Sequence, residues 1–187
     1  MGILWLFFMK ETPKKFIFKI IVIGDGAVGK TSLINRFTED GFQDDYIPTI
    51  GAQFSVYTQK INDDECILFL WDIAGQDNFH FLRPSFYKES KGAIIVYSLE
   101  ENDLGVRSLN NVKDWHNEIK KFCGDIPIII FANKVDLVNK NEMDNKKVNK
   151  IINRKKFIGV YQTSAKTGEN VDDAFKTIIK LLYNKYK

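Results

Sequence analysis

A glycine-rich segment near the start of the chain has the residue types and spacing of a phosphate-binding loop. It matches the pattern GxxxxGK[ST] and lies between an apolar run and an amphipathic one, the context of a strand followed by a helix. Glycines let the backbone curl and present N–H groups to an anion, and the helix that follows adds its N-terminal dipole. We expect the Lys30 ammonium to reach the β- and γ-phosphates of a nucleotide and the Thr31 hydroxyl to bind Mg²⁺. The predicted binding residues are Gly24, Asp25, Gly26, Ala27, Val28, Gly29, Lys30, Thr31 and Ser32.

Two later segments carry groups that could distinguish guanine from adenine. Asn-Lys-Val-Asp at 133–136 follows a strand that we predict to end at Phe131, and Ser-Ala-Lys at 164–166 follows the last predicted strand. The Asp136 carboxylate can accept from N1 and N2 of guanine, whereas adenine would leave it buried without donors. The Ala165 N–H can donate to guanine O6, and the stem of the lysine in the first segment can lie along the base. The predicted base-binding residues are Asn133, Lys134, Asp136, Ser164, Ala165 and Lys166.

From about Phe16 onward the chain resembles a Ras-superfamily GTPase, and most closely the Rab branch. Besides the three segments above, Tyr-Ile-Pro-Thr-Ile-Gly at 46–51 resembles the first switch and Trp-Asp-Ile-Ala-Gly-Gln at 71–76 the second. All five motifs occur in the family's order and at its spacing. The resemblance implies a switch that binds GTP with Mg²⁺ and slowly hydrolyses it to GDP and phosphate.

The resemblance also implies roles for residues near the first switch. Phe42 should pack against the guanine and Tyr46 should close over the phosphates. The Thr49 hydroxyl should ligate Mg²⁺ while its N–H contacts the γ-phosphate.

In the second switch, Asp72 should hold Mg²⁺ through water and the Gly75 N–H should contact the γ-phosphate. Gln76 should orient the attacking water, and Gly26 leaves room for it. The catalytic residues implied are Gln76, Lys30 and Gly75, with Thr31, Thr49 and Asp72 at the metal. Arg83 is a candidate arginine finger within the chain.

Partners implied by the resemblance are an exchange factor, a GTPase-activating protein and effectors, which would bind through residues near 46–54 and 71–87. Phe54, Trp71 and Phe86 match a Rab-type aromatic triad, although core packing would produce the same residue types. Asp-Asn-Phe at 77–79 and Leu-Arg-Pro at 82–84 depart from the Rab pattern. We expect a monomer.

Two rival functions use the same phosphate loop. A scaffold that binds GTP or GDP without turnover is disfavoured by Gly26, Thr49 and Gln76, and a P-loop kinase or ATPase is disfavoured by the 133–136 segment. No basic patch interleaved with aromatic residues indicates nucleic acid.

The elements that must position these residues predict an α/β fold. We expect a three-layer P-loop G domain over 16–187, with a mostly parallel sheet of about six strands, one of them antiparallel, and helices on both faces. Predicted strands are 16–23, 52–61, 66–71, 93–97, 126–131 and 157–162, and predicted helices are 30–37, 106–122 and 171–183.

Composition and the chain ends suggest where the protein works. With 187 residues, 44% hydrophobic, and two cysteines in no metal-like spacing, the chain indicates one globular domain in a reducing, cytoplasmic compartment. Residues 1–15 form an extension with an apolar run at 3–9 followed by lysines. This extension could lie in a membrane interface, or pack on the protein's own surface, or reflect a misassigned start. Net charge is +3, and the lysine-rich residues 140–187 could be a solvated surface or one that prefers anionic partners.

Overall fold

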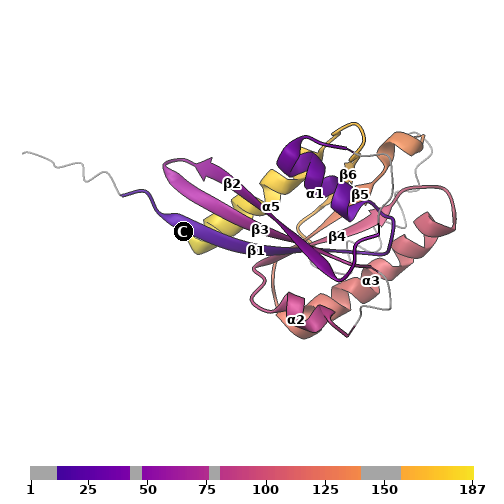
Figure 1. Cartoon of the computed structure of the whole chain (residues 1–187), viewed down its shortest axis with the longest axis horizontal. Helices are drawn as coiled ribbons and strands as arrows, with labels where there is room; N and C mark the ends of the chain where they lie inside the picture. The colour runs from indigo at the N-terminus through magenta and orange to yellow at the C-terminus, as the bar shows by residue number, and fades with distance from the viewer. Residues whose placement is uncertain (1–11, 43–47, 76–80, 140–156) are drawn as a thin grey trace, which may run out of the picture.

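The computed structural model describes residues 12–42, 48–75, 81–139 and 157–187. Its centre is a six-stranded sheet in the order β2-β3-β1-β4-β5-β6 (Figure 1). The strands are β1 Lys15–Ile23, β2 Ala52–Ile61, β3 Asp64–Ile73, β4 Gly92–Ser98, β5 Ile128–Asn133 and β6 Val160–Thr163. The helices are α1 Lys30–Glu39, α2 Arg83–Tyr87, α3 Asp103–Cys123, α5 Val171–Tyr186 and the 3-10 turn η2 Val135–Leu137.

Every strand pairing in this sheet is parallel except that of β2 with β3. These two strands form a hairpin in which Phe54 faces Trp71 and Ile61 faces Asp64. Asn62 takes a left-handed conformation at the turn, with φ 56°, which asparagine tolerates better than most residues. The predicted fold class, including its one antiparallel pair, is confirmed.

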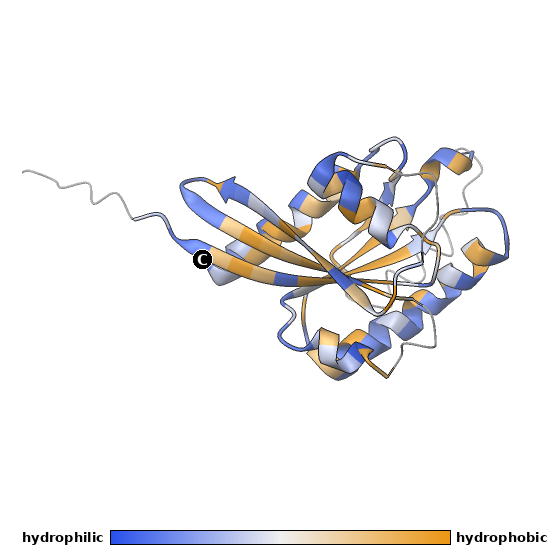
Figure 2. Ribbon diagram, in the orientation of Figure 1, coloured by the Kyte–Doolittle hydropathy of each residue, from blue (hydrophilic) through white to orange (hydrophobic). Residues whose placement is uncertain are grey.

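The sheet is covered on both faces, so the molecule has two cores. On one face α1 and α5 pack over the sheet, through Phe37 and Phe175 among others, while α2 and α3 cover the opposite face through Tyr87 and Trp115 (Figure 1). Apolar residues are concentrated along the strands, and the outer surface of α3 is largely polar (Figure 2). This matches the helical periodicity that predicted α3 and α5.

The boundaries of every strand except β2 differ from the sequence-based expectation, and β3 spans Asp64–Ile73 instead of 66–71. β5 extends to Asn133 instead of ending at Phe131, because Asn133 pairs with Ser98 of β4 and its carbonyl accepts from the Leu99 N–H at 2.8 Å. β6 begins at Val160, later than the predicted start at Phe157. In the described part of the chain no helix is long and apolar enough to cross a membrane.

Candidate nucleotide-binding site

The predicted site residues gather at one edge of the sheet. The phosphate loop follows β1, Gly75 follows β3, the 134–136 segment follows β5 and the 164–166 segment follows β6. The carboxyl ends of parallel strands meet at the same edge, where open α/β sheets bind ligands. Segments that are far apart in the sequence are thereby brought together.

The phosphate loop is closed around the Lys30 side chain. Its Nζ donates to the carbonyls of Gly24 at 3.0 Å and Asp25 at 2.7 Å, and only 6% of the residue is exposed. Burial lowers the pKa of the ammonium to about 8, against the charges of Asp72 and Asp25, which act to raise it. A Cβ at Gly24 would lie 2.1 Å from the Val96 carbonyl oxygen, so this position has no room for a side chain.

Three oxygens from separate segments meet beside this loop. The Thr31 hydroxyl lies 2.5 Å from Asp72 Oδ2 and 3.0 Å from the Thr49 hydroxyl, which is itself 3.3 Å from Asp72 Oδ2. Asp72 is 3% exposed, and burial raises the pKa of its carboxyl against the opposing hydrogen bond from Thr31 and the charge of Lys30.

The chemistry of this oxygen cluster fits a hard divalent cation. Asp72 Oδ1 is buried and has no hydrogen-bond partner among the residues that the structure describes. Within the same residues no group of three or more His, Cys, Asp or Glu side chains could hold a metal. Because octahedral Mg²⁺ takes more ligands than the three oxygens gathered here, a cation at this place would be completed by waters or by the phosphates of a ligand.

Asn133 joins the phosphate loop to the base-reading segments. Its Nδ2 donates to the Val28 carbonyl at 2.9 Å, and its Oδ1 accepts from the Ala165 N–H at 3.2 Å and the Thr163 hydroxyl at 3.3 Å. The residue is 1% exposed, and its Nδ2 would be only 2.3 Å from a Cβ at Gly29. Asn133 therefore links the phosphate loop to the segment after β6. The Ala165 N–H, which we expected to face guanine O6, has a partner within the protein as well.

The Asp136 carboxylate is oriented by its neighbour in the other base-reading segment. Asp136 Oδ1 accepts from the Ser164 hydroxyl at 2.6 Å, and that hydroxyl in turn accepts from the Thr167 N–H at 3.0 Å. Lys166 is exposed. The sequence prediction missed Arg36 of α1, whose guanidinium donates to the carbonyls of Ala165 at 2.8 Å and Lys166 at 2.7 Å. No pattern near Arg36 would have indicated a contact about 130 positions away.

The parts of the switches that the structure describes lie against the phosphate loop. A Cβ at Gly75 would be 2.2 Å from the Gly24 carbonyl oxygen and 2.7 Å from the Gly26 nitrogen. Phe42 is partly buried and packs against the core that includes Phe37 and Phe175, and Ser32 is partly buried. Tyr46 and Gln76 lie outside the described residues.

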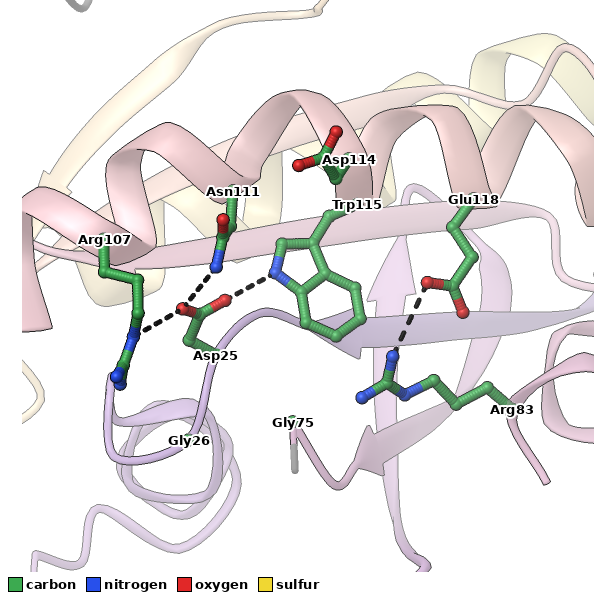
Figure 3. Close-up of a pocket in the computed structure, with 9 residues that line it drawn as sticks. All are labelled: Asp25, Gly26, Gly75, Arg83, Arg107, Asn111, Asp114, Trp115 and Glu118. Atoms are coloured by element: carbon green, nitrogen blue, oxygen red, sulfur yellow. Dashed lines mark hydrogen bonds and ion pairs between the residues drawn. The ribbon is translucent and has the colours of Figure 1, made fainter. Parts of the chain in front are cut away.

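A cavity of about 450 Å³ is lined by the phosphate loop, Gly75, Arg83 and residues of α3 (Figure 3). The Asp25 carboxylate at its wall accepts from Trp115 Nε1 at 2.8 Å and Asn111 Nδ2 at 2.9 Å. Because the carboxylate is directed at α3, only the backbone of Asp25 remains for a phosphate. Arg83, our candidate arginine finger, is 5% exposed, stacks its guanidinium over Trp115 and pairs with Glu118 at 3.6 Å.

The three predicted aromatic residues form one contiguous group. The ring centroids of Phe54 and Trp71 are 5.8 Å apart, and those of Trp71 and Phe86 are 5.9 Å apart. Phe54 is 60% exposed, so core packing does not account for its presence. The group lies on the outer part of the sheet, beside the second switch.

Comparison with known proteins agrees with this geometry. The model of the Ras family matches residues 19–184. Ras-related protein Rab-1D of Dictyostelium discoideum is 35% identical over 171 residues, which are 91% of this chain and 81% of that protein. Rab-13 of Bos taurus is 34% identical over 165 residues, 88% of this chain and 79% of that protein. Rab-21 of Homo sapiens is 34% identical over 170 residues, 89% of this chain and 72% of that protein.

The resemblance drawn from the motifs is thus confirmed over most of the chain. The five motifs occur in the matched region, and the phosphate loop and the two base-reading segments follow the ends of β1, β5 and β6. The chain belongs to the Ras family and is a small GTPase, most similar to Rab proteins, that binds guanine nucleotides and hydrolyses GTP as a molecular switch.

Proposed function

We propose that this GTPase binds Mg²⁺–GTP through the residues named above and that residues 16–187 form its G domain, with 1–15 as an extension. Backbone N–H groups of the loop and Lys30 bind the phosphates, and the hydroxyls of Thr31 and Thr49 with Asp72 hold the cation. Mg²⁺, when bound, neutralises charge that develops on the phosphate oxygens. The burial of Lys30 and Asp72 supports this proposal, because buried opposite charges are stabilised by ligands of complementary charge.

Asp136 is assigned the choice of base, with Lys134 against the base face. The single observation that carries the assignment is that Asn133 bonds both to Val28 and to Ala165. This joint holds the phosphate loop and the two base-reading segments side by side.

The Asp136 assignment is tested by comparing how the wild type and the Asp136→Asn variant bind nucleotides with different bases. Asp136→Asn should weaken GTP and GDP binding by at least about tenfold, because two charge-assisted acceptor interactions are lost. The same change should improve binding of xanthosine triphosphate, whose C2 carbonyl can accept from the new amide. Titration calorimetry measures the affinities of both proteins for GTP and for xanthosine triphosphate. Asp125→Asn, at an exposed aspartate, is the control, and an unchanged preference for GTP in Asp136→Asn would refute the assignment.

Hydrolysis is assigned to Gln76, which orients the attacking water, with Gly75 and Lys30 as electrostatic partners. Loss of the γ-phosphate would release the loops at Thr49 and Gly75, and so change what binds to them. The partners proposed are an exchange factor, a GTPase-activating protein and effectors that bind near 46–54 and 71–87. The exposed aromatic surface at Phe54 supports this location.

We also infer a cytoplasmic monomer that works in Rab-like membrane trafficking or signalling and contacts a membrane peripherally through residues 3–15. Lysines gather where this extension enters the fold. Lys14 and Lys187 meet at Asp64, whose carboxylate accepts from the Lys14 N–H at 2.8 Å and lies 3.8 Å from Lys187 Nζ, and Lys185 lies over the ring of Tyr186. A basic end of the molecule would add attraction to an anionic surface.

A further inference from the structure

The proposed base-binding lysine has a charged partner that the nucleotide chemistry leaves without a role. Lys134 Nζ lies 2.5 Å from Oε2 of Glu100, in the segment after β4. The two side chains are only 25% and 20% exposed. Partial burial makes such an ion pair stronger than an exposed one, because water screens it less.

Glu100 is itself held in place by neighbouring groups. Its Oε2 accepts from the Ser98 hydroxyl at 2.8 Å, and its N–H donates back to that hydroxyl at 3.2 Å. Ser98 is 1% exposed. The first turn of α3 packs so closely on this segment that a Cβ at Gly105 would be 1.8 Å from the Glu100 carbonyl oxygen. The carboxylate is therefore a fixed anchor.

The pair also spans two adjacent strand ends. Ser98 faces Asn133 in the β4–β5 register, and the Leu99 N–H donates to the Asn133 carbonyl at 2.8 Å. Lys134 then takes a left-handed conformation with φ 70°, which costs free energy for a residue with a side chain. Burial would raise the pKa of Glu100, but hydrogen bonds from Lys134 and Ser98 outweigh it and hold the pKa below its usual value. The carboxylate is thus ionised at neutral pH.

We propose that Glu100 is a positioning residue for nucleotide retention: it anchors the Lys134 ammonium, extends the lysine stem along the base face, and thereby slows nucleotide release. This inference rests on the proposed role of Lys134. An anchored side chain loses less conformational entropy when the nucleotide binds, so the complex is more stable. Because the contact lies at the base end, it acts equally on GDP and GTP and leaves hydrolysis unaffected.

The test measures release of fluorescent GDP and of a non-hydrolysable GTP analogue from Glu100→Gln. Losing one charge-assisted partner should speed both releases by about tenfold and by the same factor, with single-turnover hydrolysis of bound GTP unchanged. Glu100→Asp keeps the charge on a shorter arm and should give a smaller acceleration. Glu101→Gln, the exposed neighbour, is the matched control and should release nucleotide at the wild-type rate.

A double-mutant cycle separates positioning from a general effect on the fold. The Lys134→Met background keeps an apolar stem without an ammonium. In this background Glu100→Gln should leave nucleotide release unchanged or slow it, because the substitution removes a largely buried charge that has already lost its partner. Acceleration by the same factor in both backgrounds would overturn the proposal. If Lys134→Met speeds release and Glu100→Gln does not, positioning alone is wrong. If Lys134→Met has no effect either, the base-site assignment fails with it.

Discussion

Asn133 illustrates how one buried side chain can organise a site without touching the reacting atoms. Its amide satisfies a carbonyl in the phosphate loop and two donors near the last strand, which are separated by about 105 and 30 positions in the sequence. A buried amide with all its partners inside the protein is costly to disturb. The residue therefore belongs to the framework that sets the distance between Lys30 and Asp136.

Among the proposed roles, the one given to Gln76 bears most directly on hydrolysis. Gln76→Leu should keep nucleotide affinity, because the side chain orients water and does not bind the nucleotide. The rate of phosphate release should fall on the order of 10²-fold, the cost of losing a positioned reactant. Rapid-quench single-turnover measurements check this. Gln53→Leu, at an exposed glutamine on β2, should keep the wild-type rate, and unchanged rates for both variants would contradict the role.

Among the elements, the short helix α2 is tied to α3 by side chains of three residues. Glu118 of α3 pairs with Arg83 and accepts from the Tyr87 hydroxyl at 2.9 Å. Tyr87 is fully buried, and burial together with the Glu118 charge raises the pKa of its hydroxyl. The end of the second-switch region is thus fixed to α3, while Gly75 at its start lies on the phosphate loop.

The hydrogen bond from Tyr87 to Glu118 predicts that Tyr87 and Tyr97, both buried, respond differently to loss of the hydroxyl. Tyr87→Phe removes a hydrogen bond to a charged acceptor and should lower the free energy of unfolding by about 1–3 kcal/mol. Tyr97→Phe should be neutral or stabilising, because the Tyr97 hydroxyl is buried without a hydrogen-bond partner among the described residues. Urea unfolding with saturating GDP compares the two variants. Equal losses from both would show that the Glu118 contact contributes no stability.

At the scale of the whole molecule, Asp64 joins the start of β1, the β2–β3 hairpin and the end of α5. Its carboxylate accepts from the Lys14 N–H at 2.8 Å and the Tyr183 hydroxyl at 2.7 Å. The hydrogen bond from Lys14 has the larger effect and that from Tyr183 the smaller, and together they lower the pKa of Asp64 below its usual 3.8. A lowered native pKa contributes stability above 3.8 that is lost as the pH falls below it.

Asp64→Asn should therefore be less stable than the wild type at neutral pH, and the difference should narrow as the pH falls below 3.8. Chemical unfolding at several pH values with GDP present measures the two stability curves. Asp63→Asn, at the exposed neighbour in the turn, is the control. A constant difference at every pH would exclude ionised Asp64 as the cause.

The membrane proposal concerns the whole molecule as well. The full chain should sediment with anionic liposomes more strongly than a chain that starts at Lys14, because each buried large apolar side chain contributes roughly 1.5–3 kcal/mol and each lysine about 1 kcal/mol at an anionic surface. Neutral liposomes should capture less of either. Equal binding by the two chains, or none by either, would remove the proposal.

Local patterns in the sequence were sufficient for the fold class and the family, and they named the residues that we propose bind the nucleotide. A strand followed by GxxxxGK[ST] has few other physical uses, and β-branched runs separated by helical periodicity predict a parallel sheet with covered faces. The Asn62 turn and the alternation of β2 placed the hairpin for the same local reasons.

Only the tertiary structure decided which of these residues serve the framework. Asn133 turned out to be the last residue of β5, Asp25 directs its carboxylate at α3, and Arg83 stacks on Trp115. Glu100 and Lys134 meet because β4 and β5 are neighbours in register, although 34 positions separate them in the sequence. The spacing of residues along a chain reports periodicity within one helix or strand. The contacts above depend instead on which strands pair and how far each strand extends. Pairing and strand length are decided by the free energy of burying side chains across the whole sheet.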